Sequence, residues 1–249
     1  MTPDAQLAKL QSALAALLME PAQLAAFQAK PAAYAKRRGL TGATAKLLAE
    51  MPSEGAAYFA SRRVIDRFSY LSGDLPKSVA AVDTAVGLEA TYFTERPYAK
   101  EDPRAEVRQF KVWAQQAARS GKIPRPLADL AAIEAGGMML MDRAYVKPKR
   151  SQQLAKAPGI VLLRLRHDPN ELLHGVTLEA PEGRYPTALV REPDDVEVYK
   201  LEPVAESLLN AATGKRTPDQ VVAALAPRFG AKAVRTSLRD LRRLGLLAP

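Results

Sequence analysis

The residues best suited to chemistry in this chain are two histidines and the carboxylates that lie between them. His167, Asp168, Glu171 and His174 fall within the stretch HDPNELLH. Imidazole nitrogens and carboxylate oxygens are common ligands of zinc and other transition metals. One hypothesis is therefore a metal-dependent enzyme that uses His167, Asp168 and His174. The sequence holds no third histidine and no cysteine to complete such a site, so we interpret residues 167–169 as a turn and His174 as a surface or structural residue.

The sequence lacks the other common catalytic motifs. It has no glycine-rich phosphate loop followed by Lys and Ser or Thr, no Gly-x-Ser-x-Gly elbow, and no cysteine for a disulfide, a thiolate metal ligand or a nucleophile. Asp194 and Asp195 follow Pro193, which is typical of a turn rather than of an acid–base pair. The EAGG stretch at 134–137 lies within a helical pattern and indicates a close helix contact rather than a cofactor loop. We therefore expect no active site within this chain alone.

Positive charge is the more informative chemical feature. Lys and Arg number 36 against 27 Asp and Glu, a formal net charge of +9, and such a balance favours anionic partners. Arg235, Arg239 and Arg242 are spaced so that a helix over 231–244 places them on one face. The opposite face carries the apolar residues Val234, Leu238, Leu241 and Leu244. Such a helix can lie in a DNA major groove or along an acidic peptide, and an ordinary solvated face is the competing interpretation.

The residues from 160 to 249 predict a three-stranded sheet followed by three helices. Leu163 and Leu165 alternate with arginines in IVLLRLRHD, the period-two pattern of a strand. TALVREPDDVEVYKL predicts a hairpin whose strands, 187–191 and 196–201, are joined by a Pro-Asp-Asp turn. Helices are expected over 202–212, 217–229 and 231–244. These elements predict a compact α+β domain.

The first 146 residues predict helices throughout. Apolar residues recur there at three- and four-residue spacings, and prolines and glycines separate the runs. The helix that follows Ser53 carries an apolar stripe that we expect to be its buried side, formed by Tyr58, Val64, Ile65, Phe68 and Leu71. Residues 147–159 hold two prolines and several basic residues, so we expect an exposed linker. The predicted organisation is a helical domain over 1–146, a linker over 147–159 and an α+β domain over 160–249.

The sequence shows no sign of secretion or of membrane insertion. It begins with polar residues, Thr2 to Asp4, and lacks a basic stretch followed by an apolar run, so we expect no signal peptide. No apolar run approaches the roughly 20 residues that span a bilayer. We therefore expect a cytoplasmic protein that does not bind a membrane.

The tail from Tyr199 to Pro249 resembles the small winged-helix domains called RiPP recognition elements. These domains are related to the peptide chaperone of pyrroloquinoline quinone biosynthesis and bind the leaders of ribosomally made precursor peptides. The matching features are a leucine that closes a strand, a leucine pair before a glycine, a threonine that starts a helix and a leucine-rich last helix, at Leu201, Leu208–Leu209, Thr217 and Leu238–Leu247. The resemblance implies a winged-helix fold for residues 160–249, with a three-stranded sheet and three helices.

The wider order of elements resembles the partner proteins of multinuclear non-heme iron-dependent oxidative enzymes, which include companion subunits in methanobactin and 3-thiaglutamate biosynthesis. LADLAAIEAGGMMLMDRAY, VLLRLRHDPNELLHG and the winged-helix tail carry this resemblance, which covers residues 120–249. It implies that this chain is a required, non-catalytic subunit in a heterodimer with a TIM-barrel iron enzyme, which residues 1–146 would bind. The iron would belong to the partner, and this chain would hold no cofactor.

The resemblance also implies that the leader peptide binds as an added strand at the edge of the sheet. The expected contact residues are Val196, Val198, Lys200, Leu201, Arg235, Arg239 and Arg242. Val198 or Leu201 would help to form an apolar floor, and the three arginines would meet acidic leader residues. The alternative is a winged-helix DNA-binding regulator that uses the same last helix for recognition. Nucleic acid is not the partner we expect, because the helical domain lacks an obvious ligand pocket or dimer heptad.

Overall fold

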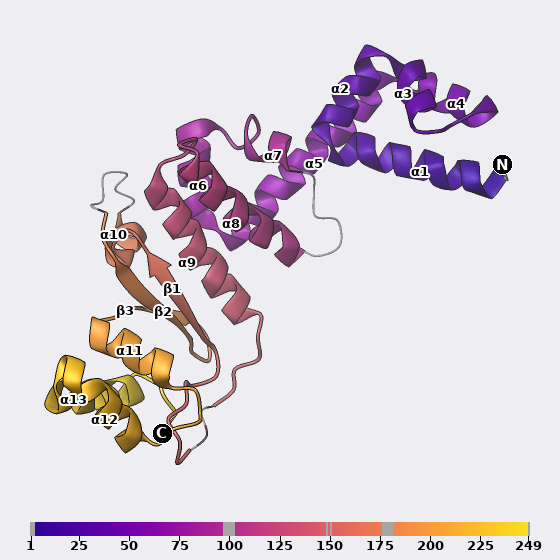
Figure 1. Ribbon diagram of the computed structural model, residues 1–249. Coiled ribbons are helices and arrows are strands. Elements are labelled where there is room, and N and C mark those ends of the chain that lie inside the picture. The colour runs from indigo at the N-terminus through magenta and orange to yellow at the C-terminus, as the bar shows by residue number, and fades with distance from the viewer. Residues whose placement is uncertain (1–2, 97–102, 148, 150, 176–181, 249) are drawn as a thin grey trace. The chain divides into compact units, whose positions relative to one another are not determined.

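The computed structural model describes all residues except 1–2, 97–102, 148, 150, 176–181 and 249 (Figure 1). Helices and one antiparallel sheet make up the described chain, which confirms the α+β class. The chain divides into two compact units, Met1–Trp113 and Ala114–Pro249, whereas the predicted division lay at residue 146. The two divisions differ because α9 (Arg125–Met141), expected as the last helix of the first domain, packs against the sheet.

Unit 1 is helical throughout its described part. Its helices are α1 (Pro3–Met19), α2 (Pro21–Ala29), α3 (Pro31–Arg37), α4 (Gly42–Ala49), α5 (Ser53–Asp74), α6 (Pro76–Val86), α7 (Tyr92–Glu95) and most of α8 (Pro103–Arg119). Proline occupies the first turn of α2, α3 and α6. A proline there loses no hydrogen bond, yet it cannot continue the helix before it. Each of these prolines therefore ends one helix and starts the next.

Helices α1 to α4 close around a small apolar core. Leu17, Phe27 and Tyr34 are almost fully buried in it. The Tyr34 hydroxyl donates to the carbonyl oxygen of Ala13 at 3.3 Å, which ties α3 to α1. In the described part of the chain no single helix is long and apolar enough to cross a membrane. Helices α1 and α2 meet that length and composition together, with a bend of 109° between them.

A buried ion pair joins α5 to α8. Arg67 Nη2 lies 2.7 Å from Glu106 Oε1, and both side chains are almost completely buried. The Tyr92 hydroxyl donates to the same carboxylate oxygen at 2.9 Å. Burial first, and the Glu106 carboxylate second, raise the pKa of Tyr92, so its hydroxyl remains a hydrogen-bond donor. Because each charge would be costly to bury without the other, this cluster fixes how the two helices pair.

Helix α5 exposes much of the apolar stripe that we predicted to be buried. Tyr58 is 65% exposed and Ile65 is 53% exposed, and Phe68 is also exposed. The prediction is confirmed at Leu71, which is completely buried, and Arg67 is buried as well. The prediction was wrong at Tyr58, Ile65 and Phe68 because it took apolar type as a sign of burial. The charged side chain of Arg67 is buried on this helix because it forms an ion pair with Glu106.

Unit 2 holds the sheet and the remaining helices. In chain order they are α9, β1 (Ile160–Leu165), α10 (Pro169–His174), β2 (Tyr185–Arg191), β3 (Val196–Lys200), α11 (Pro203–Ala211), α12 (Pro218–Phe229) and α13 (Ala231–Arg243). The strands pair antiparallel in the order β1-β2-β3. The predicted hairpin and the three predicted C-terminal helices are confirmed, within one or two residues at each end.

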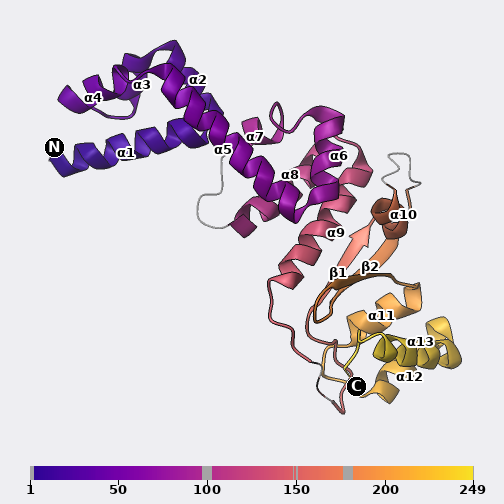
Figure 2. The same cartoon turned by 180° about the vertical axis from the view of Figure 1, so that it is seen from behind.

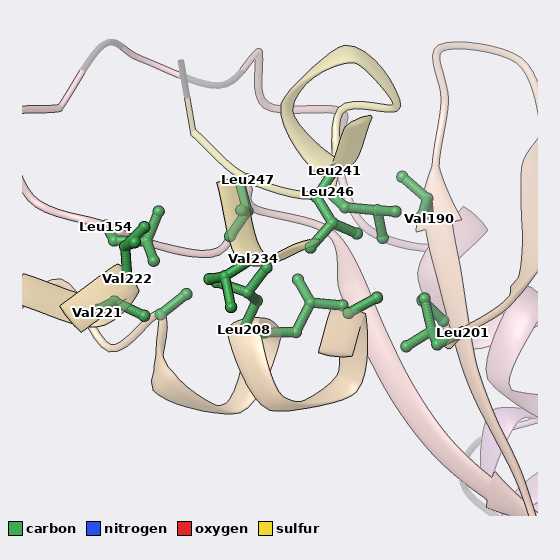
Figure 3. Packing of buried hydrophobic residues seen from close by; sticks show 14 residues of the cluster. Leu154, Val190, Leu201, Leu208, Val221, Val222, Val234, Leu241, Leu246 and Leu247 are labelled. Carbon is green, nitrogen blue, oxygen red and sulfur yellow. The ribbon is translucent and has the colours of Figure 1, made fainter. Parts of the chain in front are cut away.

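Both faces of the sheet are covered by helices. Helix α9 lies beside the sheet in both views (Figure 1 and Figure 2), and with α10 it forms one apolar layer against Leu165 and Leu189. The other face packs against α11 to α13, where Leu208, Val234 and Leu241 gather in one cluster (Figure 3). The central strand β2 is therefore buried almost along its whole length.

Gly136 in α9 allows the helix to lie close to β2. A Cβ atom built on this glycine would be 2.5 Å from Leu189 Cδ1, well inside van der Waals contact. Leu189 is completely buried, so its side chain has little room to move. The prediction that the EAGG stretch marks a close helix contact is confirmed.

The predicted linker is only partly exposed. Residues 151–153 are exposed, but Leu154 and Ala157 are buried. Leu154 belongs to the cluster beneath α11 to α13, and the Ala155 carbonyl accepts a hydrogen bond from the N–H of Ala248 at 3.0 Å. The prediction of an exposed linker over 147–159 was wrong for these residues, because the side chain of Leu154 joins the core of the helical layer and Ala157 is buried beside it in the chain.

Candidate functional site

Strand β3 presents a backbone edge to which no described strand is paired. In an antiparallel ladder, residues point their N–H and C=O groups alternately toward the partner strand and away from it. The Leu201 N–H donates to the Pro186 carbonyl at 2.7 Å, and Tyr199 pairs with Ala188 in the same register. The groups of Val198 and Lys200 between them therefore point outward. These two residues provide the donors and acceptors on which another strand can pair.

The side chains of β3 alternate between the two faces of the sheet. Val196 and Val198 pack into the layer formed with α9. Tyr199 and Leu201 pack into the layer of α11 to α13. The two residues predicted to form an apolar floor therefore lie on opposite faces of the sheet. Leu201 lies on the face of the last three helices, and Val198 lies on the face of α9.

A groove with a volume of about 710 Å³ lies between the end of β3 and α13. We call it the β3–α13 groove. Its apolar lining residues include Tyr199, Leu201, Val204, Phe229, Ala233 and Leu244. Lys200 also lines it, next to the outward-facing backbone of β3. The groove therefore combines an unpaired strand edge with an apolar wall, as strand addition requires.

The predicted arginines of α13 do not line this groove. The apolar side of the helix was predicted correctly, since Val234 and Leu241 are buried. The groove-facing residues of α13 are instead Lys232, Ala233, Thr236, Ser237, Asp240, Leu241 and Leu244. At about 100° per residue, the mean direction of Arg235, Arg239 and Arg242 lies roughly 150° around the helix from the mean direction of the groove-facing residues. They form a separate face, on which Arg235 and Arg239 are exposed.

The polar and small residues on the groove wall were not predicted from the sequence. Ala233, Thr236 and Ser237 are spaced by three and one residues, and their short side chains leave room beside β3. Lys232 and Asp240 are the charged residues of α13 at the groove. A run of small residues along one flank of an otherwise charged helix was the signal that could have found them.

His167 and Asp168 of HDPNELLH contact different residues rather than each other. His167 Nδ1 lies 2.8 Å from Asp129 Oδ2, and the same oxygen accepts the backbone N–H groups of residues 166 and 167. Asp168 caps α10 by accepting the N–H of Asn170. His174 is exposed at the end of α10. Among the residues that the structure describes, no group of three or more such side chains could hold a metal ion.

Asp168 also fixes the end of the strand that borders the groove. Its Oδ2 lies 2.5 Å from Lys200 Nζ, so α10 is tied to β3. The hydrogen bond from Lys200 lowers the pKa of Asp168, and the same contact raises the pKa of Lys200. The Lys200 side chain is engaged on the α10 side of the sheet, whereas its backbone faces the open edge.

No protein-family model matches this chain. A comparison with curated proteins likewise finds no match. The geometry of the β3–α13 groove is therefore the basis on which a function is assigned.

Proposed function

We propose that this chain is a non-catalytic subunit that binds an extended peptide as a fourth strand on β3 and presents it to a separate enzyme. The observation that carries the proposal is the β3–α13 groove, where the outward-facing backbone of Lys200 lies beside an apolar wall, on the strand edge that Val198 continues. Backbone hydrogen bonds would supply affinity that tolerates many sequences. The pockets beside Leu201 and Ala233 would select alternate side chains of the peptide.

The kind of peptide and the kind of enzyme are proposed from the resemblance of residues 120–249 to partner proteins of iron-dependent oxidative enzymes. Three antiparallel strands followed by three helices support the winged-helix assignment. On that assignment the peptide is the leader of a ribosomally made precursor, and the partner is a TIM-barrel iron-dependent oxidative enzyme. The iron would be bound by the partner, and this chain would contribute the peptide.

One observation favours the DNA-binding alternative. Arg235 and Arg239 are exposed on the face of α13 that does not border the groove. Guanidinium groups on a helix can contact phosphates in a major groove. Such binding would leave the β3–α13 groove empty, so variants of the groove distinguish the two functions.

A selection for peptides tests the proposal directly. A display library of random 20-residue peptides would be panned on the immobilised full-length chain, with the Ala233→Trp variant used for counter-selection. Ala233 is exposed and lines the groove, so the indole would fill it. We expect the enriched peptides to carry apolar residues at alternate positions. Their affinity, measured by fluorescence anisotropy, should fall at least about tenfold in Ala233→Trp.

The matched control is Ala223→Trp, the same change at an exposed position of α12 away from the groove. It should bind the selected peptides as the unaltered chain does. Val198→Pro provides a second test, because proline removes one outward N–H while an edge strand tolerates it. Selected peptides that bind all three variants equally would refute strand addition at this groove.

A further inference from the structure

One polar hollow adjoins the β3–α13 groove, and a second adjoins the first hollow. The first has a volume of about 530 Å³ and shares Lys200, Leu201 and Glu202 with the groove. The second has a volume of about 250 Å³ and shares Arg164 with the first. The first hollow therefore borders the groove near Glu202, and Arg164 borders both hollows. We call the two hollows together the arginine path.

Positive charge dominates the arginine path. Arg164, Arg184 and Arg228 line the first hollow, and Arg119, Arg125 and Arg166 line the second, with Arg164 common to both. All six side chains are exposed. A ligand that carries carboxylates could therefore meet several guanidinium groups in succession.

Three carboxylates on or beside the path have partners, and Glu202 also lines the first hollow. Glu206 accepts hydrogen bonds from Arg184 at 2.9 and 3.1 Å and lies 3.5 Å from Arg164. Asp129 is held by His167 and by backbone N–H groups. Arg125 pairs with Glu182 at 2.5 Å. These contacts neutralise part of the charge, and the path keeps an excess of guanidinium groups.

We infer that the arginine path binds an acidic segment of the same peptide whose apolar segment occupies the β3–α13 groove. This inference rests on the proposed function and adds the chemistry of the substrate: alternating apolar residues followed or preceded by a run of Asp and Glu. Guanidinium groups suit this role because they pair with carboxylates through two parallel hydrogen bonds. A nucleic acid fits less well, because its backbone would have no use for the apolar groove that is continuous with the path.

The test uses a peptide selected on the groove and synthesised in four forms. An Asp/Glu run or a neutral Ser/Gln run of equal length would be added to its N-terminus or to its C-terminus. We expect one of the two acidic forms to bind the full-length chain about tenfold more tightly than its neutral counterpart. Each exposed ion pair contributes little, and several together give about this factor. The preferred end would show the direction in which the peptide runs.

The variant Arg119→Gln/Arg166→Gln/Arg228→Gln removes three charges from the path. It should abolish the preference for the acidic form and leave the affinity for the neutral form unchanged. The matched control, Arg216→Gln/Arg235→Gln/Arg239→Gln, removes three charges from exposed positions outside the path and should keep the preference. Both variants would be checked for an unchanged thermal unfolding temperature.

The outcomes separate the inference from the function on which it rests. Equal binding of acidic and neutral forms, or a preference that survives in the path variant, would overturn the inference while leaving strand addition intact. A preference lost only in the control would place the acidic contacts at Arg216, Arg235 or Arg239 and would equally overturn it. Displacement of the acidic peptide by a random DNA duplex from the Ala233→Trp variant would show that the path binds any polyanion, and this would also overturn the inference. Failure of every form to distinguish the unaltered chain from Ala233→Trp would refute the proposed function itself.

Discussion

Asp168 and Lys200 show how one contact positions the edge of a strand. The pair joins the first turn of α10 to the last residue of β3, at 2.5 Å. Its pH dependence follows from the two pKa shifts. The lowered pKa of Asp168 means that its contribution to stability is present above the ordinary Asp pKa and is lost as the pH falls through the folded value. The raised pKa of Lys200 means that its contribution is lost only as the pH rises through its own folded value.

Asp168→Asn should therefore lower the thermal unfolding temperature near neutral pH and should have a smaller effect below about pH 4, the ordinary Asp pKa, where protonation of the unfolded chain begins to offset the stabilisation. Asparagine still caps a helix well, so the change removes mainly the charge. Circular dichroism melts at a series of pH values measure the difference. If the difference in unfolding temperature between Asp168→Asn and the unaltered chain stayed constant down to about pH 3, the Asp168–Lys200 ion pair would not be its cause.

The Arg67–Glu106 pair is the second contact at this scale. Glu106→Ala leaves the Arg67 guanidinium buried without its counterion, so we expect a loss of about 3–5 kcal/mol in the free energy of unfolding. Denaturation followed by fluorescence reports on this cluster, because the single tryptophan, Trp113, is buried in unit 1. Asp66→Ala breaks a half-exposed pair with Arg63 at 3.6 Å and is the control. It should cost less than about 1 kcal/mol, and equal losses would argue against a special role for the buried pair.

At the scale of elements, α9 can lie close to the sheet because Gly136 has no side chain. Gly136→Ala would bring a methyl group to 2.5 Å from Leu189 Cδ1. We expect it to destabilise the chain by about 1–3 kcal/mol, although alanine favours a helix. Gly137→Ala meets nothing closer than Val196 Cγ1 at 3.9 Å and should stabilise the chain by up to about 1 kcal/mol. Urea denaturation measures the change in the free energy of unfolding for both variants. Changes of opposite sign would confirm the close contact at Gly136, and changes of the same sign would contradict it.

Helix α5 offers a similar comparison between its two sides. Leu71→Ala should cost about 2–5 kcal/mol, because Leu71 is completely buried. Ile65→Ala should cost less than about 1 kcal/mol, because the side chain is 53% exposed and leaves no cavity. Tryptophan fluorescence during denaturation measures both. Similar losses would mean that the Ile65 face is covered in solution.

Sequence patterns located the elements well where the signal is local. The Pro-Asp-Asp turn set the β2–β3 hairpin, and the apolar spacing of α13 identified the side that is buried at Val234 and Leu241. They were weaker where the signal depends on a neighbour. Nothing in the periodicity of α5 indicates that Arg67 has a buried carboxylate to pair with, so the buried side could not be identified.

At the scale of the whole molecule, the net charge of +9 favours anions of any kind. The groove adds selectivity, because an apolar wall and a strand edge do not depend on charge. Binding of a selected peptide with neutral ends should therefore change less than about threefold between about 50 and 200 mM salt, whereas nucleic-acid binding should fall by orders of magnitude. Anisotropy titrations at both concentrations measure this. A steep fall for the neutral peptide would favour the DNA-binding alternative.

The groove, the arginine path and the sheet that borders them all lie in unit 2. Unit 1 has its own clusters and its own exposed apolar residues on α5. On the proposed function, unit 2 holds the peptide, and unit 1 is the part of the chain expected to bind the partner.

The sequence by itself determined the α+β class, the hairpin, the helices that follow it and the apolar side of α13, because each depends on residues close together in the chain. Only the tertiary structure decided the rest. It placed α9 on the sheet, buried Leu154 under the last helices, and turned Ala233 rather than Arg235 toward β3. Periodicity defines which side of a helix is apolar. Which segments contact the other sides of the helix depends on how distant parts of the chain pack.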